Sequence, residues 1–224
     1  MSVKKLFADK PQVVYSTSSA HSGLIRVWKH HDGLVLEVGG YPQSVSLGTS
    51  DLAERYWSKA VAEVGERLSG PRRALIIGVG GATILHLLTQ RFSDLEIVGV
   101  ELDPEIIDIA RRFFSLDDIN NLSVVEGDGA KYVLSCEGDR FDLTFVDAYL
   151  GGNFPLHFEE ERFLRRLREI TDPAGLVAIN RASGFDRPSF EKLLGGVFAK
   201  VEVVKIPLPG FLGGWAGNLL YFCQ

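Results

Sequence analysis

The sequence of 224 residues predicts an α/β fold with a mostly parallel sheet, an antiparallel hairpin at its C-terminal end, and a small N-terminal β element. Three observations predict it. From residue 74 onward, short apolar runs alternate with segments of helical periodicity, which is typical of a parallel sheet covered on both faces. The last two apolar runs have no helix between them, so they pair antiparallel or lie apart. The pattern also changes once, near residue 70, from short β-like runs separated by turn signals to apolar runs that alternate with helical segments.

Residues 1–49 are predicted to form a small antiparallel hairpin or meander. Its β-like runs, separated by glycine-containing turn signals, are 24–28, 34–38 and 45–47. A helix is expected next, with Ser50 or Asp51 as its N-cap and an apolar face that reaches Leu68. This helix opens the main domain, which we expect to span residues 50–224.

The main domain is expected to alternate strands and helices and to end on two strands. The expected strands are 74–77, 97–100, 122–125, 143–146, 176–179, 201–206 and 218–222. The expected helices are 83–91, 104–114, 129–135, 159–170 and 187–198. An antiparallel ending is unusual for nicotinamide-binding domains and is typical of the Rossmann-like class I methyltransferase sheet. We therefore expect that fold.

Composition narrows the classes of function. The formal net charge of −5 and the isoelectric point near 5.6 argue against broad binding of nucleic acid, which needs a clustered positive surface. No apolar run reaches the roughly 18 residues of a membrane helix, and no apolar stretch follows the N-terminal lysines as in a secretory signal. The two cysteines have no metal-binding spacing, so no metal is expected. We expect a cytoplasmic protein without membrane partners.

Residues that follow the first two strands point to an adenosine ligand, because open parallel sheets bind ligands at the carboxyl ends of their strands. Gly78, Gly80 and Gly81 follow the first strand and allow the backbone to approach a ligand closely. Glu101, with Leu102 beside it, ends the second strand, where a carboxylate can accept hydrogen bonds from both ribose hydroxyls.

Acidic residues also follow the next two strands. Asp128 follows the third and could accept from an adenine amino group, with Gly129 leaving room for the ring. Asp147 follows the fourth, where a cationic amine or sulfonium would be held. Each acid alone could be a helix cap. Glycines after one strand and acids after the next three together indicate a site for S-adenosylmethionine or its decarboxylated form.

The same motifs resemble the spermidine synthase family of aminopropyltransferases and its methyltransferase relatives. The matching segments are the glycine loop 78–83, Val100-Glu101-Leu102-Asp103, Asp128-Gly129-Ala130 and the upstream Gly39-Gly40-Tyr41-Pro42-Gln43. The resemblance implies a small N-terminal β element before the α/β domain, a substrate contact from Gln43, and a homodimer. It also matches Tyr56 to the tyrosine of the family's Tyr-His-Glu segment.

Several acids of the family pattern are missing. Gly81 stands in place of the aspartate that holds the donor's aminopropyl amine, and Leu150 replaces the second acid of the catalytic loop. Trp57 and Ser58 replace the His and Glu of the family's Tyr-His-Glu segment. A polyamine needs several carboxylates along a slot. Methyl transfer to a small-molecule acceptor is therefore the first expectation, aminopropyl transfer the alternative, and a non-catalytic binding protein a third.

Asp147 is the expected catalytic residue, because an amine can attack only after its proton has left. Tyr149 flanks it, and His157 in the following loop either faces the substrate or lies on the surface. His157 and Tyr15 are the next candidates if Asp147 fails. The apolar segment 207–215 is expected to form a dimer interface or a lid over the site.

Overall fold

The computed structural model describes residues 10–138, 140–182, 184–207 and 217–224, which form two sheets. The smaller sheet is antiparallel and consists of β1 (Gln12–Ser19), β2 (Gly23–His30), β3 (Gly33–Val38) and β4 (Tyr41–Val45). The expected N-terminal β element is thus confirmed. Its first strand was not predicted, because the serine- and threonine-rich sequence of β1 lacks the apolar alternation that marks a strand.

The larger sheet has the order β10-β11-β9-β8-β5-β6-β7 and confirms the predicted fold class. Its strands are β5 (Arg73–Ile77), β6 (Glu96–Glu101), β7 (Leu122–Glu126), β8 (Phe141–Val146), β9 (Thr171–Ala182), β10 (Val201–Pro207) and β11 (Gly217–Cys223). The five strands from β5 to β9 pair in parallel, and β11 pairs antiparallel with both β9 and β10. The two last strands therefore pair rather than lie apart.

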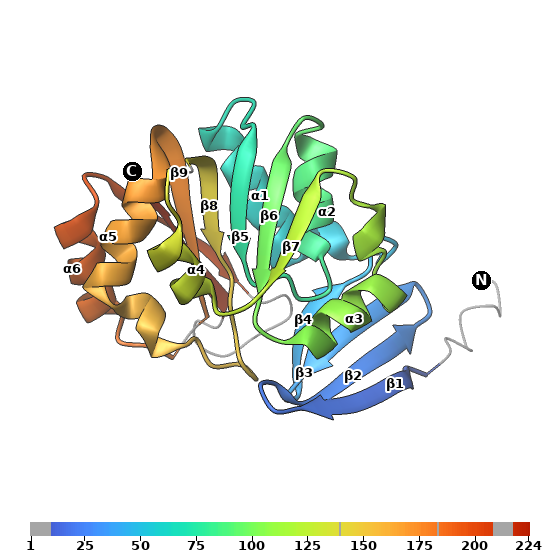
Figure 1. Cartoon of the computed structure of the whole chain (residues 1–224). Helices are drawn as coiled ribbons and strands as arrows, with labels where there is room; N and C mark the ends of the chain where they lie inside the picture. The colour runs from blue at the N-terminus through green and yellow to red at the C-terminus, as the bar shows by residue number, and fades with distance from the viewer. Residues whose placement is uncertain (1–9, 139, 183, 208–216) are drawn as a thin grey trace.

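Helices cover both faces of this sheet (Figure 1). They are α1 (Tyr56–Arg67), α2 (Thr83–Arg91), α3 (Pro104–Phe113), α4 (Gly129–Ser135), α5 (Glu161–Ile170) and α6 (Arg187–Val197). Helices α1 and α2 bury one core with Ile76 and Phe145, whereas α4, α5 and α6 bury the other with Leu75 and Ile179. The alternation of strand side chains thus supplies two apolar faces.

Helix α1 begins later than expected. Asp51 precedes a 3₁₀ turn at Leu52–Glu54 without capping it, and the α-helix starts at Tyr56. The carboxylate of Asp51 instead accepts a hydrogen bond from Arg55 Nε at 2.7 Å. Asp103, in contrast, caps α3, since it accepts from the backbone N–H of Glu105 at 3.1 Å.

The small sheet lies next to the carboxyl ends of β5 and β6, with α3 packed on it (Figure 1). Ile25 and Leu36 of the small sheet form a buried cluster with Ile106 and Ile109 of α3. This third core joins the two sheets. It leaves the strand ends facing β3 and β4 rather than solvent.

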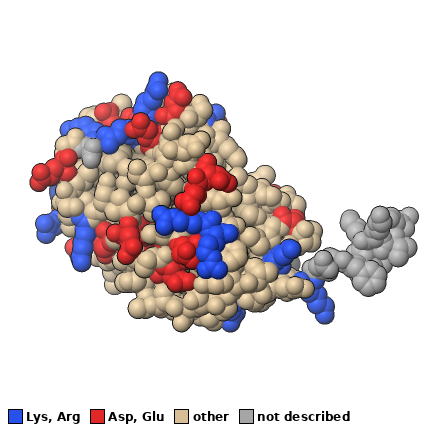
Figure 2. All heavy atoms as spheres, turned by 45° about the vertical axis from the view of Figure 1, so that its right-hand side comes forward, with Lys and Arg blue, Asp and Glu red and all other residues tan. Residues whose placement is uncertain are grey.

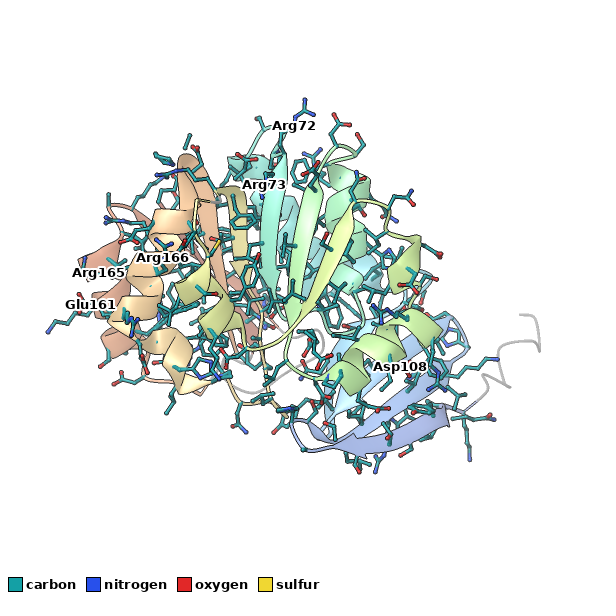
Figure 3. The ribbon with its side chains drawn as sticks, viewed as in Figure 1. Arg72, Arg73, Asp108, Glu161, Arg165 and Arg166 are labelled. Carbon is teal, nitrogen blue, oxygen red and sulfur yellow. The ribbon has the colours of Figure 1, made fainter. Side chains whose placement is uncertain are left out.

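Charged side chains of both signs lie beside one another on the face seen in Figure 2. On α5, Glu161 pairs with Arg165 at 2.6 Å, one helical turn away (Figure 3). Arg72 and Arg73 mark the opposite end of β5 from the strand ends discussed below (Figure 3). Within the described ranges, no helix has the length and apolar character needed to cross a membrane.

Candidate functional site

A cavity of about 690 Å³ lies between the strand ends and the small sheet. That volume is in the range of small-molecule sites. Eleven of the twelve residues predicted for the site line it: Gln43, Tyr56, Gly78, Gly80, Glu101, Leu102, Asp128, Gly129, Asp147, Tyr149 and His157. The fold therefore brings together residues that lie more than 100 positions apart in the chain.

Glu101 ends β6 and binds the glycine loop. Its Oε2 accepts from the backbone N–H groups of Val79 at 3.0 Å and Gly80 at 3.1 Å, and its Oε1 accepts from Asp103 N at 3.2 Å. Burial raises the pKa of Glu101, while these backbone donors oppose the rise. The carboxylate thus fixes the loop, and its place in the cavity wall also suits ribose hydroxyls.

The glycine loop needs its first glycine. Gly78 has φ +94°, a conformation that other residues rarely adopt, and a Cβ there would overlap the backbone carbonyl of Asp147. The N–H of Asp147 in turn donates to the carbonyl of Ile77 at 2.8 Å. The ends of β5 and β8 are therefore in direct contact, which places Asp147 beside the glycine loop.

Gly81 does not line the cavity, contrary to the prediction for it. Its N–H donates to Ser44 Oγ at 2.7 Å, and a Cβ at position 81 would come within 2.7 Å of Ser44 Cβ. The reason lies in β4, which Thr83 ties to the loop through two hydrogen bonds with the backbone of Val45 at 2.7 and 3.0 Å. Ser44 thus occupies the space that an acid at position 81 would need.

Asp128 and His157 form the end of the cavity beyond β7. Asp128 caps α4, because its Oδ1 accepts from Lys131 N at 2.9 Å, and its Oδ2 lies 3.7 Å from His157 Nε2. The His157 ring packs on Phe158, with ring centroids 4.4 Å apart. His157 therefore faces the cavity beside the predicted adenine contact rather than beside Asp147.

Asp147 is half-buried at the end of β8. Its Oδ1 accepts a hydrogen bond from Asn180 Nδ2 at 2.7 Å. Burial raises the pKa of Asp147 to about 6, and Asn180 and the nearby Tyr56 hydroxyl limit the rise. A carboxyl group with that pKa can both accept and release a proton near neutral pH.

Two tyrosines flank Asp147. The buried Tyr56 hydroxyl makes no hydrogen bond of normal geometry with the described residues, and burial followed by the charge of Asp147 raises its pKa well above the usual value. The Tyr149 hydroxyl accepts from Ala182 N at 2.6 Å and donates to the carbonyl of Asn180 at 3.1 Å. The hydroxyl therefore bonds the backbone groups at the end of β9, which extend past the last residue of β8 and so lie beyond its pairing with β9. Only the ring of Tyr149 remains to contact a ligand.

Three polar residues that line this part of the cavity were not predicted from the sequence: Arg55, Asn180 and Asn218. Asn180 directly follows the apolar run 176–179, so the rule applied to the other strand ends would have found it. Arg55 and Asn218 carry no such signal. Arg55 lies one residue before α1, and only the pairing of β11 with β9 brings Asn218 to the site.

Other predictions are placed elsewhere. The Tyr15 hydroxyl donates to Glu105 at 3.0 Å, and Tyr15 is absent from the cavity wall. Among the residues that the structure describes, no group of three or more His, Cys, Asp or Glu could hold a metal ion, and Cys136 and Cys223 are both buried. The predicted interface or lid at 207–215 falls almost wholly outside the described residues.

The chain is similar in sequence to known aminopropyltransferases and methyltransferases. The chain is 31% identical over 176 residues to a polyamine aminopropyltransferase of Chromobacterium violaceum, a match that covers 77% of this chain and 67% of the relative. It is 30% identical over 138 residues to a probable polyamine aminopropyl transferase of Bifidobacterium longum, covering 62% of this chain but 30% of that protein. A human eEF1A lysine and N-terminal methyltransferase is 27% identical over 121 residues, which are 49% of this chain and 17% of that protein.

The fold has close counterparts among solved structures. A spermidine synthase of Thermotoga maritima superposes with a TM-score of 0.76 at 18% identity, covering 100% of this chain and 84% of that one. Residues 54–221 match the spermine/spermidine synthase domain. Because this match covers most of the chain, it confirms what the sequence motifs implied: the chain belongs to the spermine/spermidine synthase family.

Proposed function

We propose that this chain transfers an alkyl group from an adenosyl sulfonium donor to the nitrogen of a small amine. The observation that carries the proposal is Asp147, a carboxyl group with a pKa of about 6 in the same cavity wall as Glu101 and Asp128. In such a transfer a C–N bond forms as a C–S bond breaks, and the nitrogen gives up one proton. Asp147 is the group that receives it.

Two molecules are candidates for the donor of the alkyl group. The names of the relatives support aminopropyl transfer from decarboxylated S-adenosylmethionine better than they support methyl transfer. The cavity wall supports methyl transfer from S-adenosylmethionine, and on this geometry we place methyl transfer first. Aminopropyl transfer remains the second candidate on the strength of the family.

The geometric reason for placing methyl transfer first is the small number of carboxylates that could bind ammonium groups in the cavity. Four acids line the cavity within the described ranges, and each already accepts a hydrogen bond: Asp51 from Arg55, Glu101 and Asp128 from backbone N–H groups, and Asp147 from Asn180. Residues 208–216 add no acid, since their sequence is LPGFLGGWA. A cavity with so few carboxylates, each already bonded, can meet few ammonium groups, whereas aminopropyl transfer to a diamine brings several.

Arg55 adds a second reason. It is a permanent cation in the cavity wall, close to Tyr56 in sequence. Asp51 already pairs with its Nε at 2.7 Å, and the carboxylate of S-adenosylmethionine could bind the other N–H groups of the guanidinium, whereas a polycationic acceptor or a donor without a carboxylate gains nothing from them.

The test is a product assay with both donors. Purified protein is incubated with S-adenosylmethionine or its decarboxylated form and a panel of mono-, di- and polyamines, and the products are identified by mass spectrometry. Methylated amine and S-adenosylhomocysteine are expected. Aminopropylated amine and methylthioadenosine would put the second candidate first. Calorimetric binding of both donors without either product would instead support a non-catalytic binding protein.

A further inference from the structure

Asn180 of the neighbouring strand β9 lies beside Asp147. The parallel register of β8 and β9 sets Val146 opposite Ile179, so Asp147, just past the end of β8, lies beside Asn180, which is still within β9. Asn180 is 3% exposed, and its Nδ2 lies 2.7 Å from Asp147 Oδ1. A buried amide that faces a carboxylate must present its donor side.

Asn218 fixes the other side of that amide. It belongs to β11, where the antiparallel register sets it opposite Ala182, and its Nδ2 donates to Asn180 Oδ1 at 2.9 Å. With both of its ends bonded, the Asn180 side chain cannot rotate without losing two hydrogen bonds. The chain Asn218–Asn180–Asp147 therefore runs in one direction from β11 across β9 to the end of β8.

We propose that Asn180, held in place by Asn218, is the positioning residue of Asp147: it occupies one carboxylate oxygen and leaves the other for the ligand. This inference rests on the proposed function. It assigns a role to two residues of β9 and β11 that act through Asp147 rather than on the substrate. Asn180 favours the ionised carboxylate because its hydrogen bond is to the charged form.

Burial is the largest influence on the pKa of Asp147, and the hydrogen bond from Asn180 opposes it more strongly than the Tyr56 hydroxyl does. Tyr56 faces it from α1 and Tyr149 from the loop after β8, and burial raises the pKa of both tyrosines, so both are neutral at working pH. Arg181, the residue after Asn180, directs its guanidinium to Glu159 at 2.6 Å and to the ring of Phe154.

The direct test is a ¹³C NMR titration of the Asp147 carboxyl in the full chain. The wild-type midpoint is expected near the pKa of about 6, and Asn180→Ala should move it upward by about one to two pH units, the equivalent of one charged hydrogen bond. Asn218→Ala, a milder change, should move it in the same direction by less. The control is Thr144→Val, which breaks a buried 2.8 Å hydrogen bond between Thr144 and Thr171 of the same two strands.

An unchanged midpoint in both asparagine variants would overturn the proposal, as would an equal shift in Thr144→Val. The readout needs no turnover, so it is separate from the proposed function. If the protein turns over, the acidic limb of the kcat/KM profile should move with the NMR midpoint. A moved midpoint without any turnover would uphold the positioning role and reject the proposed reaction.

Discussion

Replacing Asp147 by asparagine should make the protein more stable above neutral pH while it abolishes turnover. The amide keeps the shape of the carboxylate, and its oxygen can still accept from Asn180 Nδ2. What the variant loses is the charge. Wild-type Asp147 titrates at about 6 in the folded protein against an ordinary value of 3.8, because burial disfavours its ionised form.

The magnitude follows from that difference. A rise of about two pKa units corresponds to roughly 3 kcal/mol in the free energy of unfolding. This is an upper bound, because Asp147 is half-buried and its carboxylate faces a cavity that water can enter. A raised acid pKa stabilises the folded protein only at low pH, so wild type loses this stability as the pH rises through the window from 3.8 to about 6.

Urea unfolding at about pH 4 and about pH 8 measures the effect. Asp147→Asn should match wild type at the lower pH and exceed it by up to about 3 kcal/mol at the higher one. Asp108→Asn is the control, because Asp108 is an exposed acid on α3 (Figure 3), and it should change stability by less than about 0.5 kcal/mol. Equal stability of Asp147→Asn and wild type at both pH values would refute the argument that a buried charge is involved.

Four further predictions concern the ligand, the packing and the assembly. Glu101→Ala should weaken binding of S-adenosylmethionine and S-adenosylhomocysteine on the order of 10–100-fold, and unchanged affinity by calorimetry would reject the ribose assignment. S-adenosylmethionine should bind more tightly than its decarboxylated form, and competition binding with the reverse order would favour aminopropyl transfer. Gly129→Ala should lower the free energy of unfolding by about 1–3 kcal/mol, because the added methyl group overlaps Ile77. Gly196→Ala, in open space on α6, should raise it by about 0.5–1 kcal/mol, and equal effects of the two changes in urea would contradict the packing argument. The chain should form a homodimer, and a monomer at micromolar concentration in light scattering would exclude it.

The order of strands and helices could be predicted because it depends on local pattern. Runs such as 74–77 and 143–146 are apolar throughout, and only a strand covered on both faces explains such runs between helices. The same reasoning located Glu101, Asp128 and Asp147, since any parallel sheet gathers its carboxyl ends at one edge. Strand β1 was not predicted, because its polar sequence has no apolar periodicity and it is held in the sheet by pairing with β2.

The sequence by itself therefore determined the fold class, the family and the edge of the sheet that carries the site. Only the tertiary structure decided what each residue there can do, because that depends on contacts between distant segments. Ser44 fills the space beside Gly81 because β4 packs on the glycine loop, a contact across 37 positions. Asn218 reaches Asn180, and through it Asp147, because β11 turns back along β9. Burial, which raises the pKa of Asp147, is likewise a property of the assembled walls and of no segment alone.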